Sequence, residues 1–231
     1  MLELSAQKVA LAAEGTTIEL DPSALAEQLG SCLRIQLVGG VFAENALAAA
    51  CAALHAGVSG GDVARGLAAC PVVPGRFEVL HRAPTVAVDF AHTPDALARA
   101  CDTARSLAGG GKVLVVFGAG GERDKGKREP MGEAVASRAD EAIITTDNPR
   151  GEDPRDIARA IAKGAKKGRA KVRLVPDRRA AIEEALSSAQ PGDVVVIAGK
   201  GHERGQIIGT EVLPFSDVDL VHELTSLGKT T

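Results

Sequence analysis

The sequence has few aromatic residues: Phe occurs five times, and Trp and Tyr are absent. Proteins that bind single-stranded nucleic acid rely on aromatic side chains for base stacking, so that class is disfavoured. A formal net charge of −3 also argues against a phosphate-backbone binder. The length of 231 residues is enough for one large or two small domains. Hydrophobic residues make up 45% of these positions, which can supply a core. We therefore expect a globular protein with no nucleic-acid partner.

Cysteine pairs at metal-ligand spacing are also missing. The four cysteines, Cys32, Cys51, Cys70 and Cys101, form no C-x-x-C pair, which argues against a zinc ribbon and a disulfide framework. Buried free thiols in a reducing cytosol are the simplest interpretation. The sequence has neither a signal peptide nor an apolar run long enough to span a bilayer. We expect a cytoplasmic location and no membrane partner.

Three nucleotide-binding patterns are approached but not completed. A dinucleotide fingerprint starting at Gly118 would need its third glycine at Arg123. A phosphate-binding P-loop at 121–128 ends in Arg128 where Ser or Thr must hold magnesium. The tail at 228–231, GKTT, has Glu223 where the upstream glycine belongs. The sequence thus predicts no P-loop, no metal site and no assignable catalytic residue.

From about residue 80 onward, short apolar runs alternate with helix-like runs. Continuous runs such as VLVVF and VVVIA indicate strands buried on both faces, and hence a mostly parallel, doubly wound α/β sheet. Strands are predicted at 86–89, 113–117, 142–145, 172–175 and 194–198, and helices at 94–107, 131–139, 154–165 and 178–189. The runs 206–208 and 212–213 predict an antiparallel edge, and 218–227 a final helix.

In the first part of the chain, three predicted strands come before two predicted helices. Strands are predicted at 8–13, 17–20 and 33–37, and helices at 43–56 and 62–69. The break Pro71-Val72-Val73-Pro74-Gly75 follows. We place a domain boundary near residue 80, which gives domains 1–80 and 81–231.

Polar loops follow four of the predicted strands, at 89–94, 118–128, 147–153 and 199–203. In a parallel sheet the carboxyl ends of the strands share one edge, where ligands bind. The segment 145–154, TTDNPRGEDP, is the most informative. Pro149 stiffens it, Arg150 offers a planar fork of donors suited to a carboxylate, and Asp153 reads as a helix cap. The alternative is a well-made turn with a solvated arginine.

Five motifs together resemble the Mur ligase family. They are VPGRFEVL (73–80), VDFAHTPDAL (88–97), VFGAGGERDKGKREPMG (116–132), TTDNPRGEDP (145–154) and IAGKGHERGQ (197–206). The resemblance implies the family's C-terminal amino-acid-binding domain at 81–231. It also implies that 1–80 is the end of a truncated α/β ATP-binding domain, with weaker similarity. The P-loop half of that domain and the family's UDP-sugar domain have no counterpart here.

The resemblance also implies a reaction: ATP and Mg2+ activate the peptide carboxylate of UDP-MurNAc-L-Ala-D-Glu, and the amine of meso-diaminopimelate then attacks. The implied amino-acid site comprises Arg123, Asp147, Asn148, Pro149, Arg150, Gly199 and Glu203. Arg150 would clamp the distal carboxylate, Asn148 and Asp147 would bond the ammonium or α-groups, and Glu203 would contact the far end of the ligand.

The implied nucleotide-contacting residues are Asn45, Arg76, Asp89 and His92. The family usually has Tyr in place of Phe90 and Asn in place of Phe42, so the nucleotide side departs from the pattern. Because the P-loop is missing, we expect the chain to be inactive alone. The alternatives are a non-catalytic amino-acid-binding module and a ligase portion that uses ornithine or lysine. A relative of folylpolyglutamate or cyanophycin synthetases is disfavoured by the DNPR and GKGHE motifs.

Overall fold

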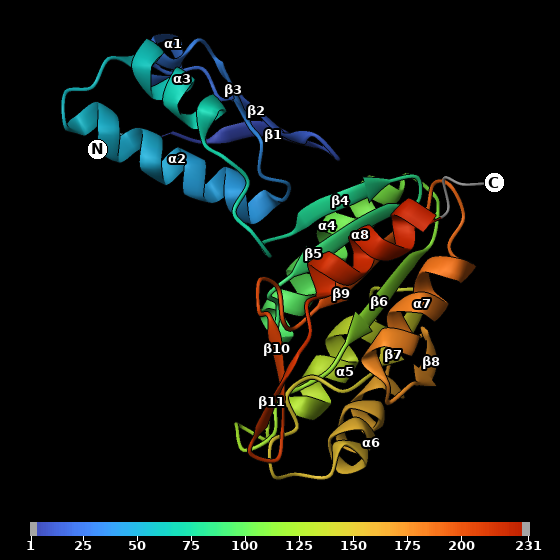
Figure 1. Ribbon diagram of the computed structural model, residues 1–231. Coiled ribbons are helices and arrows are strands. Elements are labelled where there is room, and N and C mark those ends of the chain that lie inside the picture. Colours follow the sequence, from blue (N-terminus) through green and yellow to red (C-terminus); the bar gives the residue numbers. More distant parts are fainter. Residues whose placement is uncertain (1–3, 228–231) are drawn as a thin grey trace. The chain divides into compact units, whose positions relative to one another are not determined.

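The chain forms two compact units, Met1–Val73 and Pro74–Thr231, in a computed structural model that describes residues 4–227 (Figure 1). The two units divide at the predicted PVVPG break, just before the boundary expected at residue 80. The P-loop-like tail at 228–231 lies outside the described residues.

The first unit is a three-stranded antiparallel sheet, order β1-β2-β3, with three helices. Its elements are β1 (Ala6–Ala12), β2 (Gly15–Leu20), α1 (Ala24–Leu29), β3 (Cys32–Ile35), α2 (Gly40–His55) and α3 (Gly60–Ala69). Alternate residues of β2 and β3, such as Ile18 and Leu33, are buried with Ala46 and Ala50 of α2, as a half-buried sheet requires. The six-residue helix α1, capped by the Ser23 side chain, was not predicted. The expectation of buried thiols is wrong for Cys32 and Cys70, which are exposed, whereas Cys101 is buried.

The second unit is built on a six-stranded sheet of order β4-β5-β9-β6-β7-β8. Its strands are β4 (Glu78–Arg82), β5 (Thr85–Asp89), β6 (Val113–Phe117), β7 (Glu141–Ile144), β8 (Lys171–Leu174) and β9 (Val194–Ala198). The strands from β5 to β8 in this order pair in parallel, and only β4 is antiparallel. Every residue of β6 and β9 is buried, so the predicted mostly parallel, doubly wound sheet is confirmed.

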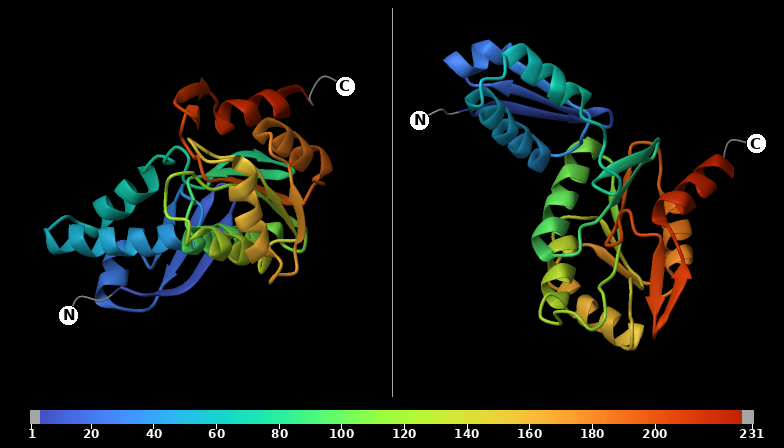
Figure 2. Two further views of the ribbon diagram at one scale, coloured as in Figure 1. Left: turned by 90° about the horizontal axis from the view of Figure 1, so that it is seen from below. Right: turned by 60° about the vertical axis from the view of Figure 1, so that its left-hand side comes forward.

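Helices cover both faces of this sheet (Figure 2). The helices α4 (Pro94–Ala108), α5 (Arg128–Ala136) and α6 (Pro154–Ala165) pack on one another, and α7 (Arg178–Ser188) packs with α8 (Asp217–Leu227). Ile182 and Val221 share a core with Val116 and Ile197 of the sheet. This arrangement leaves the carboxyl ends of β5, β9, β6 and β7 at one edge of the sheet.

One expectation about the sheet is wrong. The strands β10 (Gly205–Ile208) and β11 (Glu211–Pro214) form a separate two-stranded hairpin, not an antiparallel edge. The antiparallel edge is β4, whose sequence EVLHR carries too many polar residues to stand out as a strand. A β-bridge from Ile208 to Arg150 places the hairpin at the loop after β7.

Candidate functional site

Four of the loops that leave the carboxyl edge of the sheet are joined by hydrogen bonds. Lys127 Nζ, after β6, donates to His92 O, after β5, at 2.9 Å. Gly121 N donates to Asn148 O, after β7, at 2.9 Å. Asn148 Nδ2 in turn donates to Glu203 Oε2, after β9, at 2.9 Å. The predicted convergence of these loops is therefore present, and hydrogen bonds between the loops stabilise it.

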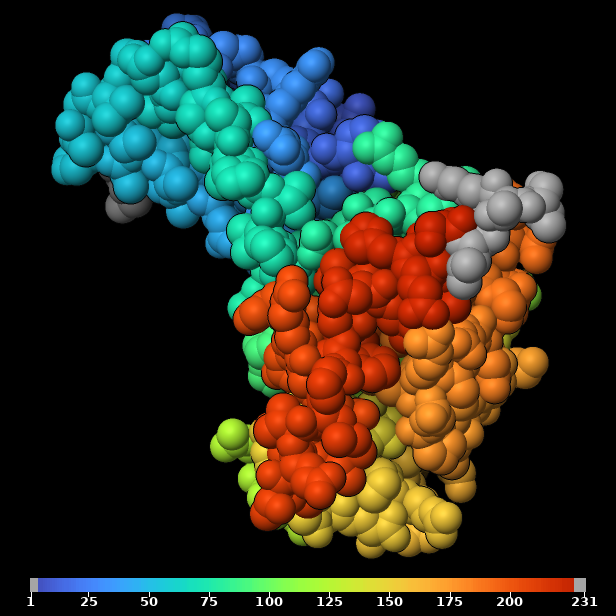
Figure 3. Space-filling view, viewed as in Figure 1, coloured from blue at the N-terminus to red at the C-terminus, as the bar shows by residue number. Residues whose placement is uncertain are grey.

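The segment after β7 makes a bend that the hairpin braces. Arg150 has a φ of 51°, a left-handed conformation that a non-glycine residue holds only when its surroundings enforce it. Its N–H donates to Ile207 O at 3.1 Å, and its carbonyl accepts from Gly209 N at 2.8 Å. Gln206 Nε2 also donates to Asp147 O at 2.8 Å. In Figure 3 the hairpin, in red-orange, lies beside the yellow segment that follows β7.

The Arg150 guanidinium is anchored on one side. Its Nη1 donates to Gly121 O at 2.9 Å and to Asn148 O at 3.3 Å. Within residues 4–227 its Nε and Nη2 donate to no protein acceptor, and the side chain is half-buried. A Cβ on Gly121 would lie 1.9 Å from Pro149 O, so the close approach of the two loops requires glycine there. The anchored fork keeps a donor edge that matches a carboxylate.

Arg123 lies next to this fork. A Cβ built on Gly120 would lie 3.1 Å from Arg150 Nη1 and 3.7 Å from Arg123 Cγ, so both arginines flank the same glycine. Arg123 is exposed. Two guanidinium groups on neighbouring loops make this part of the edge attractive to an anion.

A polar network fixes the orientation of Asn148, of which only 6% is exposed. Asn148 Oδ1 accepts from Lys200 Nζ at 3.1 Å and from Ile207 N at 3.0 Å. Its Nδ2 therefore faces Glu203. Partial burial acts to raise the pKa of Glu203, but hydrogen bonds from Asn148 and Lys200, and the charges of Lys200 and Arg150, bring that pKa below its ordinary value. Glu203 thus faces the site as an anion.

Asp147 is a second acidic residue at this edge of the sheet. It is 6% exposed, and its carboxylate accepts no hydrogen bond from any residue between 4 and 227. Gly199, with a φ of 113°, lies against it, and a Cβ there would lie 2.6 Å from Asp147 Oδ2. Gly199 therefore leaves the room that this carboxylate occupies, and Asp147 keeps free acceptor capacity for a cation.

An ion pair clamps the loops after β6 and β7, and the sequence analysis missed it. Glu152 accepts from Arg128 Nη1 at 3.0 Å and Nη2 at 2.9 Å, and from Glu122 N at 2.6 Å. Lys125 Nζ lies 3.3 Å from the same carboxylate. The Arg128 and Glu122 hydrogen bonds hold the pKa of Glu152 at about 2. The Arg128 side chain is buried in this pair instead of being solvated.

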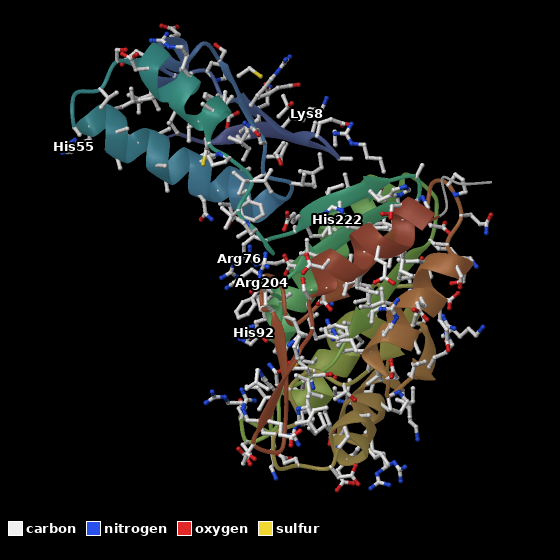
Figure 4. All side chains as sticks on the ribbon, in the orientation of Figure 1. Lys8, His55, Arg76, His92, Arg204 and His222 are labelled. Carbon is white, nitrogen blue, oxygen red and sulfur yellow. The ribbon has the colours of Figure 1, made fainter. Side chains whose placement is uncertain are left out.

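The residues that were expected to contact the nucleotide make different kinds of contact. Asp89 accepts from Phe77 N and Ala91 N, both at 2.6 Å, and burial raises its pKa in spite of these bonds. The Arg76 guanidinium lies 4.9 Å from the centre of the Phe90 ring. Figure 4 shows Arg76 and His92 on the same side of the second unit. Both Asp89 oxygens are thus engaged by the main chain, and Arg76 packs on the ring.

Asn45, the remaining expected nucleotide contact, is an exposed residue of α2 in the first unit. Among residues 4–227 no three His, Cys, Asp or Glu side chains are grouped as metal ligands. No helix in the described part of the chain is long and apolar enough to cross a membrane.

Comparisons with known proteins bear on this edge of the sheet. Residues 75–201 match the family model described as "Mur ligase, glutamate ligase domain". The chain is 45% identical over 207 residues to the UDP-N-acetylmuramoyl-L-alanyl-D-glutamate–2,6-diaminopimelate ligase of Geobacillus thermodenitrificans, covering 87% of this chain and 42% of that protein. It is 47% identical over 189 residues to the enzyme of the same name from Geobacillus kaustophilus, covering 81% and 38%.

A solved structure of a UDP-N-acetylmuramoyl-L-alanyl-D-glutamate–2,6-diaminopimelate ligase superimposes with a TM-score of 0.71 at 33% identity, covering 100% of this chain and 47% of that one. The chain therefore spans about two fifths to a half of the length of the relatives that it matches.

Proposed function

This chain belongs to the Mur ligase family, and we propose that it is the amino-acid-binding part of an ATP-dependent ligase that adds meso-diaminopimelate to UDP-MurNAc-L-Ala-D-Glu. The names of its relatives support the substrate assignment. Because the chain spans only 42% of one relative and 38% of another, the complete reaction, its ATP and Mg2+ and its cytoplasmic location are part of the proposal.

One observation carries the proposal: Arg150 presents a free Nε–Nη2 edge beside Arg123, while the Asp147 carboxylate and Glu203 provide negative charge at the same strand ends. A ligand that matches this set has both carboxylate and ammonium groups. The distal centre of meso-diaminopimelate carries one of each. Lysine and ornithine have a side-chain ammonium but no distal carboxylate for Arg150 to bind.

The residues of this chain bind and orient the amino acid. Arg150 and Arg123 bind carboxylate groups, and Asp147 and Glu203 bind ammonium groups. ATP would supply a phosphoryl group to the peptide carboxylate with release of ADP, and the amine would then displace phosphate from the acyl phosphate to form the amide. Holding the amine in place makes the attack effectively intramolecular, and this positioning lowers the barrier. Asn45, Arg76, Asp89 and His92 are proposed to lie on the nucleotide side.

Calorimetry with meso-diaminopimelate, lysine and ornithine tests this assignment. Hydrogen bonds to charged groups contribute about 1.5–3 kcal/mol, so Arg150→Ala should weaken meso-diaminopimelate binding by about 10- to 100-fold. Arg150→Lys keeps the charge without the fork and should recover only part of the affinity. Arg155→Ala, which removes an exposed arginine of α6, is the matched control.

Equal binding of lysine and meso-diaminopimelate would contradict the proposed substrate. Circular dichroism must show that the Arg150 variants remain folded, since Nη1 also supports two main-chain carbonyls.

A non-catalytic binding module is the second candidate. It is favoured for the isolated chain because neither P-loop-like segment, 121–128 or 228–231, completes the motif. An ATPase assay separates the two: the chain should bind the amino acid without turning over ATP, and steady turnover would show that it carries its own catalytic machinery.

A further inference from the structure

Lys200 is a fully buried lysine in the loop after β9, with 0% of its side chain exposed. A buried ammonium is costly unless its charge and its three donors are satisfied. Here its Nζ donates to Asn148 Oδ1 at 3.1 Å, Glu203 Oε2 at 2.9 Å and Gly205 O at 2.6 Å. All three donors are in use, so Lys200 has none left for a ligand.

The same bonds decide how Asn148 and Glu203 are presented. The Asn148 oxygen is taken by Lys200 and by the Ile207 N–H, which directs the amide nitrogen to Glu203. Glu203 Oε2 accepts from both Lys200 and Asn148. Within residues 4–227, Glu203 Oε1 accepts no hydrogen bond. One oxygen of Glu203 is therefore held while the other keeps its acceptor capacity.

The charges around Glu203 come from three elements. Lys200 is in its own loop, Arg150 follows β7, and Arg178 begins α7. Lys200 is the only one of the three with a hydrogen bond to the carboxylate among the described residues. It is thus the cation whose loss changes Glu203 most directly.

We propose that Lys200 is a positioning residue for amino-acid recognition: it fixes the Asn148 amide and one Glu203 oxygen so that the other oxygen faces the ligand's ammonium. This inference rests on the proposed function for the identity of the ligand, but the coupling of Lys200 to Glu203 does not depend on any ligand. A purely structural lysine, which only ties Gly205 to the loop, is the competing explanation.

The first test is an NMR titration of the Glu203 side-chain carboxyl carbon in the ligand-free chain. An opposite charge within hydrogen-bonding distance lowers a carboxyl pKa by about one to three units. Lys200→Met should therefore raise the titration midpoint of Glu203 by about one pH unit or more. Lys167→Met is the control, because Lys167 forms an exposed ion pair with Glu133 and should leave the Glu203 midpoint unchanged.

The second test is the pH dependence of meso-diaminopimelate binding. In Lys200→Met the affinity at pH 6 should fall by about tenfold or more, as expected for loss of a charge-assisted contact, and should fall further at lower pH as Glu203 takes up a proton. Adding Lys200→Met to the Glu203→Gln variant should lower the affinity much less than adding it to the wild type does. If Lys200→Met does not fold, Lys200→Gln, which lacks the charge, must raise the Glu203 midpoint.

An unchanged Glu203 midpoint in the Lys200 variants overturns the proposal, as does a loss of affinity that is the same in the wild-type and Glu203→Gln backgrounds. If the wild-type chain binds none of the three amino acids, the proposed function fails, whereas a raised midpoint still supports the coupling of Lys200 to Glu203.

Discussion

Arg178 and Asp217 form a buried ion pair in the second unit, and the loss of either partner should leave an uncompensated buried charge. Both side chains are 0% exposed. Arg178 Nε donates to Asp217 Oδ1 at 2.8 Å, and Nη2 donates to Oδ2 at 2.7 Å and to Ala198 O at 3.0 Å. The pair joins the first residue of α7 to the first residue of α8 and to the end of β9. We predict that Asp217→Asn strongly destabilises the unit.

The magnitude follows from burial. Removing one partner of a buried pair costs about 3–5 kcal/mol, because the remaining charge keeps its desolvation penalty without a counter-charge. Solvent screening gives no reduction here, since neither side chain is exposed. For a domain of this size 1 kcal/mol corresponds to about 2–4 °C in unfolding midpoint, so a decrease of about 6–20 °C is expected. Arg178→Met/Asp217→Leu removes both charges and should be much less costly than either single change.

Thermal unfolding of the chain measures this effect. The sequence has no Trp or Tyr, so methyl NMR signals of Ile182 and Leu220, which share the second unit's core, are a suitable probe. Asp156→Asn is the matched control, because the Arg159–Asp156 pair also lies in a helix but is 72% and 60% exposed. Exposed pairs contribute about 0–1 kcal/mol. The reasoning is refuted if Asp217→Asn lowers the midpoint no more than Asp156→Asn does.

Two further variants test the loop contacts. Glu152→Gln should lower the free energy of unfolding near pH 6, because it weakens the ion pair with Arg128. The pKa of Glu152 is held at about 2 against an ordinary 4.5. In unfolding measurements over a pH series, the stability difference between the variant and the wild type should therefore be full above pH 4.5 and disappear as pH falls toward 2. A difference that stays constant from pH 6 to 2 would contradict the charge-based role. Gly199→Ala should lower the free energy of unfolding by about 1–3 kcal/mol and weaken amino-acid binding. The reason is that Gly199 has a φ of 113° and that a Cβ there would lie 2.6 Å from Asp147 Oδ2. An unchanged affinity in calorimetry would show that Asp147 does not face the ligand.

The parts of the fold that the sequence predicts are those where burial is two-sided. VLVVF and VVVIA form the central strands β6 and β9 because continuous apolar runs pack under helices on both faces. The edge strand β4 was not predicted, because four of its residues are half-buried, the fifth is exposed, and its sequence mixes charged with apolar residues. The hairpin was misplaced because two short apolar runs specify that strands pair with each other but not whether they join a sheet.

The candidate site was predictable as a location and less so as a set of contacts. Strand-end loops in a parallel sheet must share an edge, so the meeting of Asn148 with Glu203 follows from topology. The burial of Lys200 and the Arg128–Glu152 pair did not follow, because lysine and arginine in a polar loop are usually solvated. Only the three-dimensional course of the loops shows which charges are enclosed.

For the proposed function, selectivity among amino acids should arise from the carboxylate side of the site. A buried group left unpaired by the wrong ligand can reject it by about 10⁴-fold or more, but Arg150 is half-buried, so water can still reach its free edge when lysine binds. The expected discrimination is therefore closer to the value of one charge-assisted contact, about 10- to 100-fold. Ornithine lacks the same carboxylate and should be disfavoured by a similar factor in spite of its shorter side chain. A large difference in affinity between lysine and ornithine would mean that the length of the ligand's side chain decides selectivity, through contacts with Asp147 and Glu203, and that the Arg150 fork does not.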